Sequence, residues 1–339
     1  MDLKEMTLRL SQAVGISGQE GEAAALAKEL LAPYGEVSVS PLGSVLCTVQ
    51  APKEGQPHML WDAHLDEIGM LVTYIDDRGF LKVTNTGGIN RQLLLASSVT
   101  VHSEKGPVKG VVCSIPPHLQ KDDKRKVAPM EEYYIDIGYN GQQAKEHVSV
   151  GDAVTIDSYS RELHGDLLTG KAMDDRACCA CLIRALELLK GKELSCGLTV
   201  QLSTMEEIGG MGSVTAAYQV NPTHAIAVDV SHAKTPGVPD DQCGIQGKGP
   251  MIGFAPILSR KMSQALVKVA EKEQIPYQLE GMGGRTHTNA DSMATSRGGI
   301  VTGLVSIPLK YMHTPVEVVS LEDVENTARL LAEYMLQAF

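Results

Sequence analysis

Five side chains that can bind divalent metals follow apolar runs at separate places in the chain. They are two histidines and three carboxylates: His64, Asp174, Glu207, Asp229 and His313. Four of them end or follow predicted strands, and Asp174 lies where a strand leads into a helix. Imidazole and carboxylate ligands suit Zn²⁺ or Co²⁺, and one carboxylate can hold two ions about 3.5–4 Å apart. The set therefore predicts two divalent ions that share one carboxylate.

Two further acids lie beside these candidate ligands. Asp66 follows His64 by two residues, so both side chains project to the same side of a strand, and a ligating imidazole usually donates its other N–H to a carboxylate. Glu206 precedes Glu207 between an apolar strand and a Gly-rich turn, where one Glu can bind metal while its neighbour moves protons. Taken alone, each residue also fits a structural role at a strand end, a helix start or a surface loop.

Other polar patterns give weaker signals. Cys178 and Cys181 have the spacing of a metal motif, but they lie inside a predicted helix without a second pair, which favours simple packing. His232, His287 and the glycine-rich run at 281–284 lack supporting partners. The sequence contains no phosphate loop, dinucleotide fingerprint, H-E-x-x-H or G-x-S-x-G motif.

The first part of the chain predicts helices followed by strands. Breaker residues and apolar spacing place helices at 2–13 and 20–31 and strands at 37–40, 44–50 and 58–63. From 67 to 160 short strands follow one another without a helical period, which predicts a small β-barrel or sandwich. The stretch at 121–126 carries both signs of charge and is a predicted loop.

Helices and strands alternate again beyond residue 165. Helices are expected at 174–190, 210–218, 259–273 and 321–337, and strands at 197–204, 225–230 and 300–307. Such alternation is typical of α/β domains. We therefore expect one α/β catalytic domain, with helices on both faces of its sheet, formed from 1–66 and 161–339 and interrupted by an all-β insertion at 67–160.

Composition narrows the class of protein further. The 339 residues carry a net charge of −11, which argues against a nucleic-acid partner because phosphate binding needs a basic face. No apolar run approaches the ~18 residues of a membrane span, and the first residues lack the apolar core of a signal peptide. The seven cysteines are odd in number and irregularly spaced, which favours a reducing compartment and a cytoplasmic location.

Five motifs in order resemble the tetrahedral (TET) aminopeptidases, dinuclear-metal exopeptidases of peptidase clan MH that were once labelled cellulases. The motifs are AHLDEIG at 63–69, GKAMDDR at 170–176, EEIGGMGS at 206–213, AVDV at 227–230 and SIPLKYMHTPVE at 306–317. The resemblance implies a mixed-sheet, zinc-peptidase-like domain and a PDZ-like or barrel insertion that helps twelve subunits form a hollow tetrahedron. It also implies short peptide substrates. No membrane partner is expected, because no apolar run is long enough to span a membrane.

Residue roles follow from the same resemblance. Asp174 would bridge two ions, Zn or Co. His64 and Asp229 would bind one ion, and Glu207 and His313 the other. Glu206 would be the general base, and Asp66 would orient His64. A cis peptide bond is implied between the bridging residue and the one after it.

The chain departs from the family at a loop and a hairpin. Asn289 stands where the family usually has Asp, His287 is added nearby, and the hairpin carries Gly43 and Ser44. We expect the changed loop to lie near the substrate pocket, which leaves the preferred N-terminal residue open. Two alternatives also stay open at this point: a non-catalytic peptide-binding or assembly protein, and a glucan hydrolase that would need two carboxyls about 5–9.5 Å apart.

Overall fold

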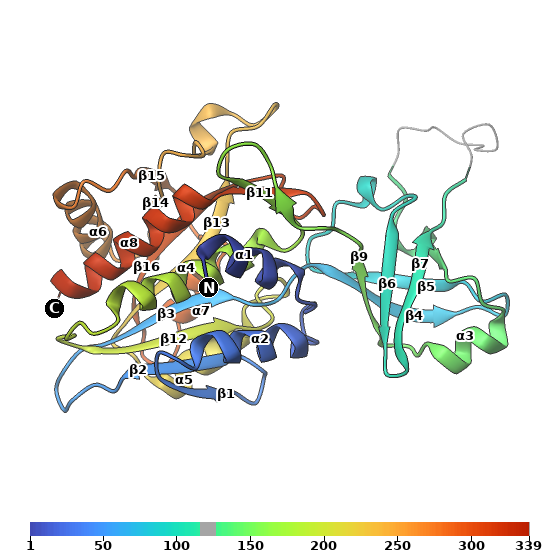
Figure 1. Cartoon of the computed structure of the whole chain (residues 1–339), viewed down its shortest axis with the longest axis horizontal. Helices are drawn as coiled ribbons and strands as arrows, with labels where there is room; N and C mark the ends of the chain where they lie inside the picture. The colour runs from blue at the N-terminus through green and yellow to red at the C-terminus, as the bar shows by residue number, and fades with distance from the viewer. Residues whose placement is uncertain (116–126, 339) are drawn as a thin grey trace.

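The computed structural model describes residues 1–115 and 127–338. Figure 1 shows a larger α/β body, to which both ends of the chain contribute, beside a smaller β-barrel. This mixed α/β architecture with a barrel confirms the predicted fold class. The predicted loop at 121–126 lies outside the described residues.

The larger body is built on a mixed sheet of eleven strands. Its strands are β1 (Glu36–Val39), β2 (Val45–Gln50), β3 (His58–His64), β10 (Arg161–Glu162), β11 (Leu167–Gly170), β12 (Gly197–Ser203), β13 (His224–His232), β14 (Met251–Phe254), β15 (Gln278–Gly281), β16 (Val301–Lys310) and β17 (Glu317–Ser320). The central strands β12, β3, β13 and β16 are parallel to one another. Helices cover both of their faces, so these strands are apolar along most of their length, and Trp61 in β3 is fully buried.

Helices pack on both faces of this sheet, as predicted. They are α1 (Leu3–Gln12), α2 (Gly21–Leu31), α4 (Met173–Leu189), α5 (Met211–Val220), α6 (Arg260–Lys272), α7 (Asn289–Ala294) and α8 (Leu321–Gln337). Helices α1, α4 and α8 contact one another in the main hydrophobic core. Helices α5 and α7 contact each other and strands β3, β12, β13 and β16 through a second core. Cys178 and Cys181 are free and fully buried in α4, which confirms their predicted packing role.

The smaller body is a closed antiparallel barrel, in which every strand has two neighbours. Its strands are β4 (Gly69–Ile75), β5 (Leu81–Thr86), β6 (Ser98–Ser103), β7 (Gly106–Val112), β8 (Tyr134–Asp136) and β9 (Ala153–Ile156), in the order β4-β5-β8-β7-β6-β9. The barrel encloses a hydrophobic core of its own, separate from the cores of the α/β body. The boundaries at 67 and 160 stay a prediction.

Several short elements differ from the sequence-based expectation. The barrel carries a seven-residue helix, α3 (Gly141–His147), which begins with a capping box between Asn140 and Gln143 and is too short to show a helical period. The pattern also missed α7, strands β10, β11, β14, β15 and β17, and the 3-10 turns η1 (Arg91–Leu93), η3 (Met130–Glu132) and η4 (Asp240–Gln242). The elements in this second group have six residues or fewer, so tertiary contacts rather than periodicity define them.

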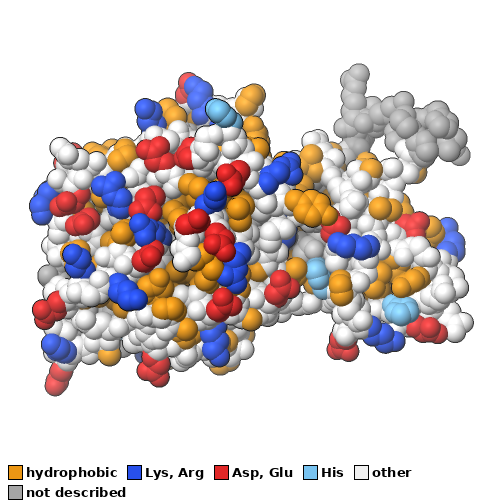
Figure 2. Space-filling view, viewed as in Figure 1, with side chains coloured by type: hydrophobic (Ala, Val, Ile, Leu, Met, Phe, Trp, Pro, Cys, Tyr) orange, Lys and Arg blue, Asp and Glu red, His pale blue; other side chains and the backbone are white. Residues whose placement is uncertain are grey.

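The surface is mixed in charge on the face seen in Figure 2. Acidic and basic side chains alternate over this face of the α/β body and the barrel, so the excess of acid forms no single patch there. Across the described parts of the chain, none of the helices has the length and apolar character needed to span a membrane.

Candidate metal centre

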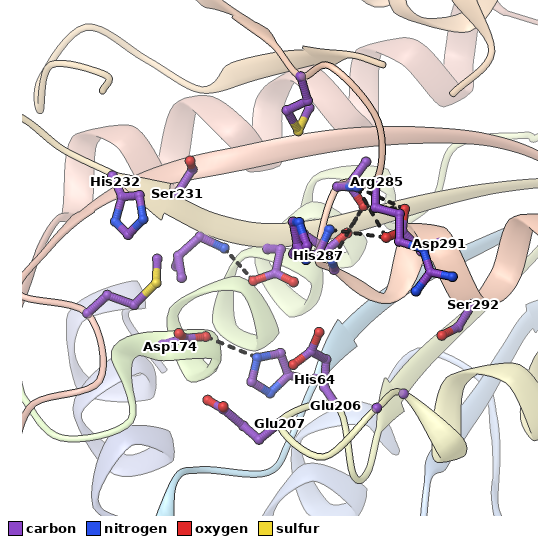
Figure 3. A pocket seen from close by; sticks show the side chains of 18 of the residues that line it. His64, Asp174, Glu206, Glu207, Ser231, His232, Arg285, His287, Asp291 and Ser292 are labelled. Atoms are coloured by element: carbon purple, nitrogen blue, oxygen red, sulfur yellow. Dashed lines mark hydrogen bonds and ion pairs between the residues drawn. The ribbon is translucent and has the colours of Figure 1, made fainter. Parts of the chain in front are cut away.

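The five predicted ligands meet at the carboxyl ends of the parallel strands. His64 is the last residue of β3, Asp229 lies near the end of β13, Glu207 follows β12, His313 follows β16, and Asp174 is in the first turn of α4. Parallel strands end at the same edge of a sheet, which explains how residues so distant in sequence come together. All five line one cavity of about 590 Å³. Figure 3 shows Asp174, Glu206 and Glu207 arranged around His64.

Asp174 lies between the two histidines. Its Oδ1 is 3.0 Å from His64 Nε2, and its Oδ2 is 3.3 Å from His313 Nε2. His313 Nε2 is also 3.3 Å from Glu207 Oε1. One carboxylate therefore presents an oxygen to each imidazole, the arrangement expected of a residue shared by two ions. The peptide bond between Asp174 and Asp175 is cis, as the resemblance implies.

Two groups of ligand atoms are close enough to hold a metal. One contains His64, Asp174 and Glu207, and the other contains His64, Asp175 and Asp229, with the atoms of each group within 4.8 Å of one another. The second group adds Asp175, to which the sequence analysis gave no role. Its Oδ2 accepts a hydrogen bond from the backbone N–H of His64 at 2.9 Å. Its Oδ1 is buried and has no hydrogen-bond partner among the described residues.

The electrostatics of the cavity favour a bound cation. Burial raises the pKa of Glu206 to about 7 and raises the pKa values of Glu207 and Asp229, and neighbouring carboxylates add to each shift. Although burial opposes it, hydrogen bonding to Asp174 and Glu207 raises the pKa of His313 to about 11. Positive charge stabilises the ionised form of such crowded carboxylates, and a divalent ion supplies that charge. The donor set and the partnerless Asp175 oxygen fit such an ion.

Asp66 holds the turn that carries the two glutamates. Its Oδ1 accepts from the backbone N–H of Glu206 at 2.9 Å, and its Oδ2 accepts from that of Glu207 at 3.1 Å. Ser17 Oγ donates to Oδ2 at 2.6 Å. His64 Nδ1 is 3.0 Å from the Asp66 backbone carbonyl oxygen and 3.4 Å from Oδ1. Asp66 therefore contacts the candidate ligand His64, as expected, and also fixes the backbone of Glu206 and Glu207.

Glu317 is a positioning residue that the sequence analysis quoted in a motif but gave no role. It is buried, and its two oxygens accept from the backbone N–H groups of Asp174, at 3.1 Å, and His313, at 2.7 Å. Burial and the nearby charge of Asp174 raise the pKa of Glu317. No sequence spacing links Glu317 to Asp174, because 143 residues separate them.

The barrel side of the chain also reaches the site, through the turn after β5. The carbonyl oxygen of Gly88 is 2.9 Å from His313 Nδ1. This contact orients the imidazole ring, whose other nitrogen, Nε2, lies near Asp174 and Glu207. A Cβ on Gly88 would lie 2.7 Å from the same nitrogen, and one on Gly87 would lie 3.0 Å from Glu207 Oε2. These two glycines allow the turn to approach both candidate ligands closely.

The changed loop forms one wall of the cavity, as expected from the sequence. His287, which has a φ of 59°, and Thr286 line the cavity, and their backbone N–H groups donate to the carboxylate of Asp291. Asn289 instead points beneath the wall, where its Nδ2 donates to Asp62 Oδ2 and to Ser203 Oγ, both at 2.8 Å. Burial raises the pKa of Asp62 to about 6. Asn289 therefore anchors the loop instead of lining the cavity.

Comparisons with known proteins identify the family. The sequence model of the M42 glutamyl aminopeptidase family matches residues 43–330. The lysyl aminopeptidase of Pyrococcus furiosus is 31% identical over 332 residues, covering 96% of this chain and 94% of the relative. A TET aminopeptidase structure from a marine sediment archaeon, Thaumarchaeota archaeon SCGC AB-539-E09, is 32% identical with a TM-score of 0.92, covering 99% of this chain and 97% of that one. The TET1 peptidase of Pyrococcus horikoshii, which can assemble into a tetrahedron or a large octahedral shell, is 30% identical with a TM-score of 0.87, covering 98% of this chain and 99% of that one.

The fold, the site and the similar proteins together identify the protein as a peptidase, which is a hydrolase. Its family implies that its activity depends on metal. The chain belongs to the M42 glutamyl aminopeptidase family and is of the TET type. Membership of this peptidase family favours an enzyme over the non-catalytic alternative.

Proposed function

We propose that this aminopeptidase removes the first residue of short peptides with the help of two divalent ions, Zn²⁺ or Co²⁺. Asp174 would bridge the ions, with His64 and Asp229 on one and Glu207 and His313 on the other. The observation that carries the proposal is the position of Asp174, with one oxygen toward each histidine at 3.0 and 3.3 Å. Asp175 lies in the group with His64 and Asp229 and is a further candidate ligand.

Bound ions of this kind supply a polarising charge for the scissile carbonyl and lower the pKa of a water molecule. The protein's own contribution is the movement of a proton. The Glu206 carboxylate accepts a proton from the attacking water and returns it to the leaving amine. Asp66 keeps the carboxylate in place by binding the backbone N–H of Glu206.

The assembly and the location of the protein are further parts of the proposal. We infer a homo-oligomer, with a tetrahedral dodecamer as the expected form, in which the barrel mediates subunit contacts. The fold shared with TET1 of Pyrococcus horikoshii, whose assemblies include a tetrahedron, supports this inference. A cytoplasmic location and the absence of nucleic-acid partners are expected from the sequence alone. The family description is glutamyl and one relative is lysyl, so these names differ on the preferred residue.

The proposed role of Glu206 is tested by Glu206→Gln, which keeps the size of the side chain. We expect the variant to bind two metal equivalents and to lose roughly 10²- to 10⁴-fold in kcat on aminoacyl anilides, the usual contribution of a general base. Glu54→Gln, at an exposed position between β2 and β3, is the matched control for the loss of one charge. Near-normal kcat in fully metallated Glu206→Gln would exclude this role.

A further inference from the structure

An acidic side chain outside the candidate metal centre lies on the wall of the same cavity. Glu280, in the edge strand β15, lines the cavity together with His64 and Asp174. Two serine hydroxyls hold its carboxylate. Ser306 Oγ donates to Oε2 at 3.0 Å, and Ser231 Oγ donates to Oε1. The carboxylate is therefore fixed in position before any substrate binds.

The two serines place Glu280 close to the metal centre. Ser231 lies two residues after Asp229 in β13, so both side chains project from the same face of the sheet. Ser306 in β16 is the register partner of Asp229 and faces the same way. Glu280 is thus anchored by one serine on the strand of a candidate metal ligand and by another on the neighbouring strand.

The charge of Glu280 is available to a ligand. Its side chain is half-buried, and among residues 1–115 and 127–338 it forms no ion pair. Two other charged residues, Asp291 and Arg285, line the same cavity. Asp291 accepts hydrogen bonds from the backbone of Thr286 and His287, and the side chain of Arg285 is exposed. In Figure 3, Arg285 and Asp291 lie on one side of the cavity and Ser231 on the other.

We propose that Glu280 selects substrates whose first residue carries a basic side chain, lysine or arginine; this inference rests on the proposed aminopeptidase function. The carboxylate offers two acceptor oxygens to an ammonium or guanidinium group, and partial burial strengthens that attraction relative to water. Met282 and Met312 also line the cavity and provide apolar surface for the long stem of such a side chain.

The test compares lysyl, arginyl, leucyl and glutamyl anilides on the metal-loaded protein. We expect the wild type to have a higher kcat/KM for the lysyl and arginyl substrates. In Glu280→Gln the ratio of lysyl to leucyl kcat/KM should fall roughly 10- to 100-fold, the value of one hydrogen bond to a charged group, and the loss should appear mainly in KM. Glu280→Lys should shift the preference toward the glutamyl substrate. Glu54→Gln, exposed and remote, should leave all ratios unchanged.

A binding arm separates this inference from the proposed function. Calorimetry measures the affinity of lysine amide and leucine amide for the metal-loaded wild type and for the variants. If Glu280→Gln proves unstable, Glu280→Asp takes its place in the test. This variant keeps the charge and shortens the side chain, so it should retain part of the lysine preference. Tighter binding of lysine amide that disappears in Glu280→Gln would support the inference even if no anilide were cleaved, an outcome that would overturn the proposed function alone. A wild type that favours leucyl or glutamyl ligands, or a Glu280→Gln variant that keeps the lysine preference, would overturn the inference.

Discussion

The carboxylate of Glu317 accepts a hydrogen bond from the backbone N–H of Asp174 at 3.1 Å, across 143 residues of sequence. Its other oxygen accepts from the backbone N–H of His313 at 2.7 Å. One buried side chain in β17 thereby fixes the backbone at the candidate bridging ligand and at a candidate terminal ligand. The spacing between Asp174 and His313 depends on this residue, although Glu317 belongs to neither group of ligand atoms.

We expect Glu317→Ala to weaken metal binding by roughly 10- to 100-fold, as losses of supporting partners around metal ligands usually do. The variant leaves the buried N–H of Asp174 and the part-buried N–H of His313 without their acceptor. Loss of the buried bond should lower the free energy of unfolding by about 1–3 kcal/mol, and loss of the other by less. Competition with a chelating indicator measures the affinity, and urea unfolding measures the stability. Unchanged metal affinity in Glu317→Ala would show that the two ligands hold their positions without it.

Removal of metal should destabilise the protein as well as inactivate it. The carboxylates Asp174, Glu207 and Asp229 are crowded beside one another, and bound dications offset their repulsion. An ion that binds only the folded state adds about 2.7 kcal/mol of stability at a free concentration 100 times its Kd. We expect thermal unfolding at a lower temperature after treatment with a chelator, and recovery on addition of Zn²⁺ or Co²⁺. An identical unfolding temperature before and after chelation would argue against a resident metal.

The turn after β5 should be sensitive to a single methyl group. A Cβ on Gly88 would lie 2.7 Å from His313 Nδ1, closer than van der Waals contact allows, so Gly88→Ala must move the ring or the turn. We expect a loss of roughly 10- to 100-fold in metal affinity or activity. Gly106→Ala, at the first residue of β7 with open space around it, controls for loss of a glycine, although its φ of 111° adds backbone strain. Activity and metal content equal to the wild type in Gly88→Ala would refute this role of the turn.

Four of the candidate ligands could be proposed from the sequence because they lie near the end of long central strands or follow them. His64 ends β3, of seven residues, and Asp229 lies near the end of β13, of nine residues; mostly apolar runs of this length indicate buried strands that end at a common edge. The proposed pairing of ligands comes from the family resemblance, because strand patterns alone leave it open. The predicted contact of Asp66 with His64 is present, with 3.4 Å between Oδ1 and Nδ1. The Asp66 carboxylate forms shorter hydrogen bonds with the backbone N–H groups of Glu206 and Glu207.

The supporting residues were not predictable, because their roles depend on contacts between distant segments. Glu280 lies in a four-residue edge strand without a clear pattern, and its serine partners come from two other strands. In the sequence Gly88 resembles any other turn residue, and only the folded structure shows its contact with His313. Short elements and close approaches of this kind arise from tertiary packing, which local propensity does not encode.

Asn289, one of the departures from the family pattern, forms a buried pair with Asp62. The Asn289 amide donates to Asp62 Oδ2 and to Ser203 Oγ, both at 2.8 Å. Asn289→Asp would remove both donors and place a second carboxylate against Asp62 in a site without water contact. We expect the variant to lose about 1–3 kcal/mol of unfolding free energy, the cost of leaving a buried polar group unsatisfied.

The exchanged pair should recover most of that loss. In Asp62→Asn combined with Asn289→Asp, an amide again faces a carboxylate, with the donor now on β3. A double-mutant cycle by urea unfolding should give a favourable coupling of about 0.5–3 kcal/mol, the range measured for residues in direct contact. Asp241→Asn, at an exposed position, is the control for the loss of an acid and should leave stability unchanged. Purely additive effects of the two substitutions would show that Asn289 is retained for a reason other than its bond to Asp62.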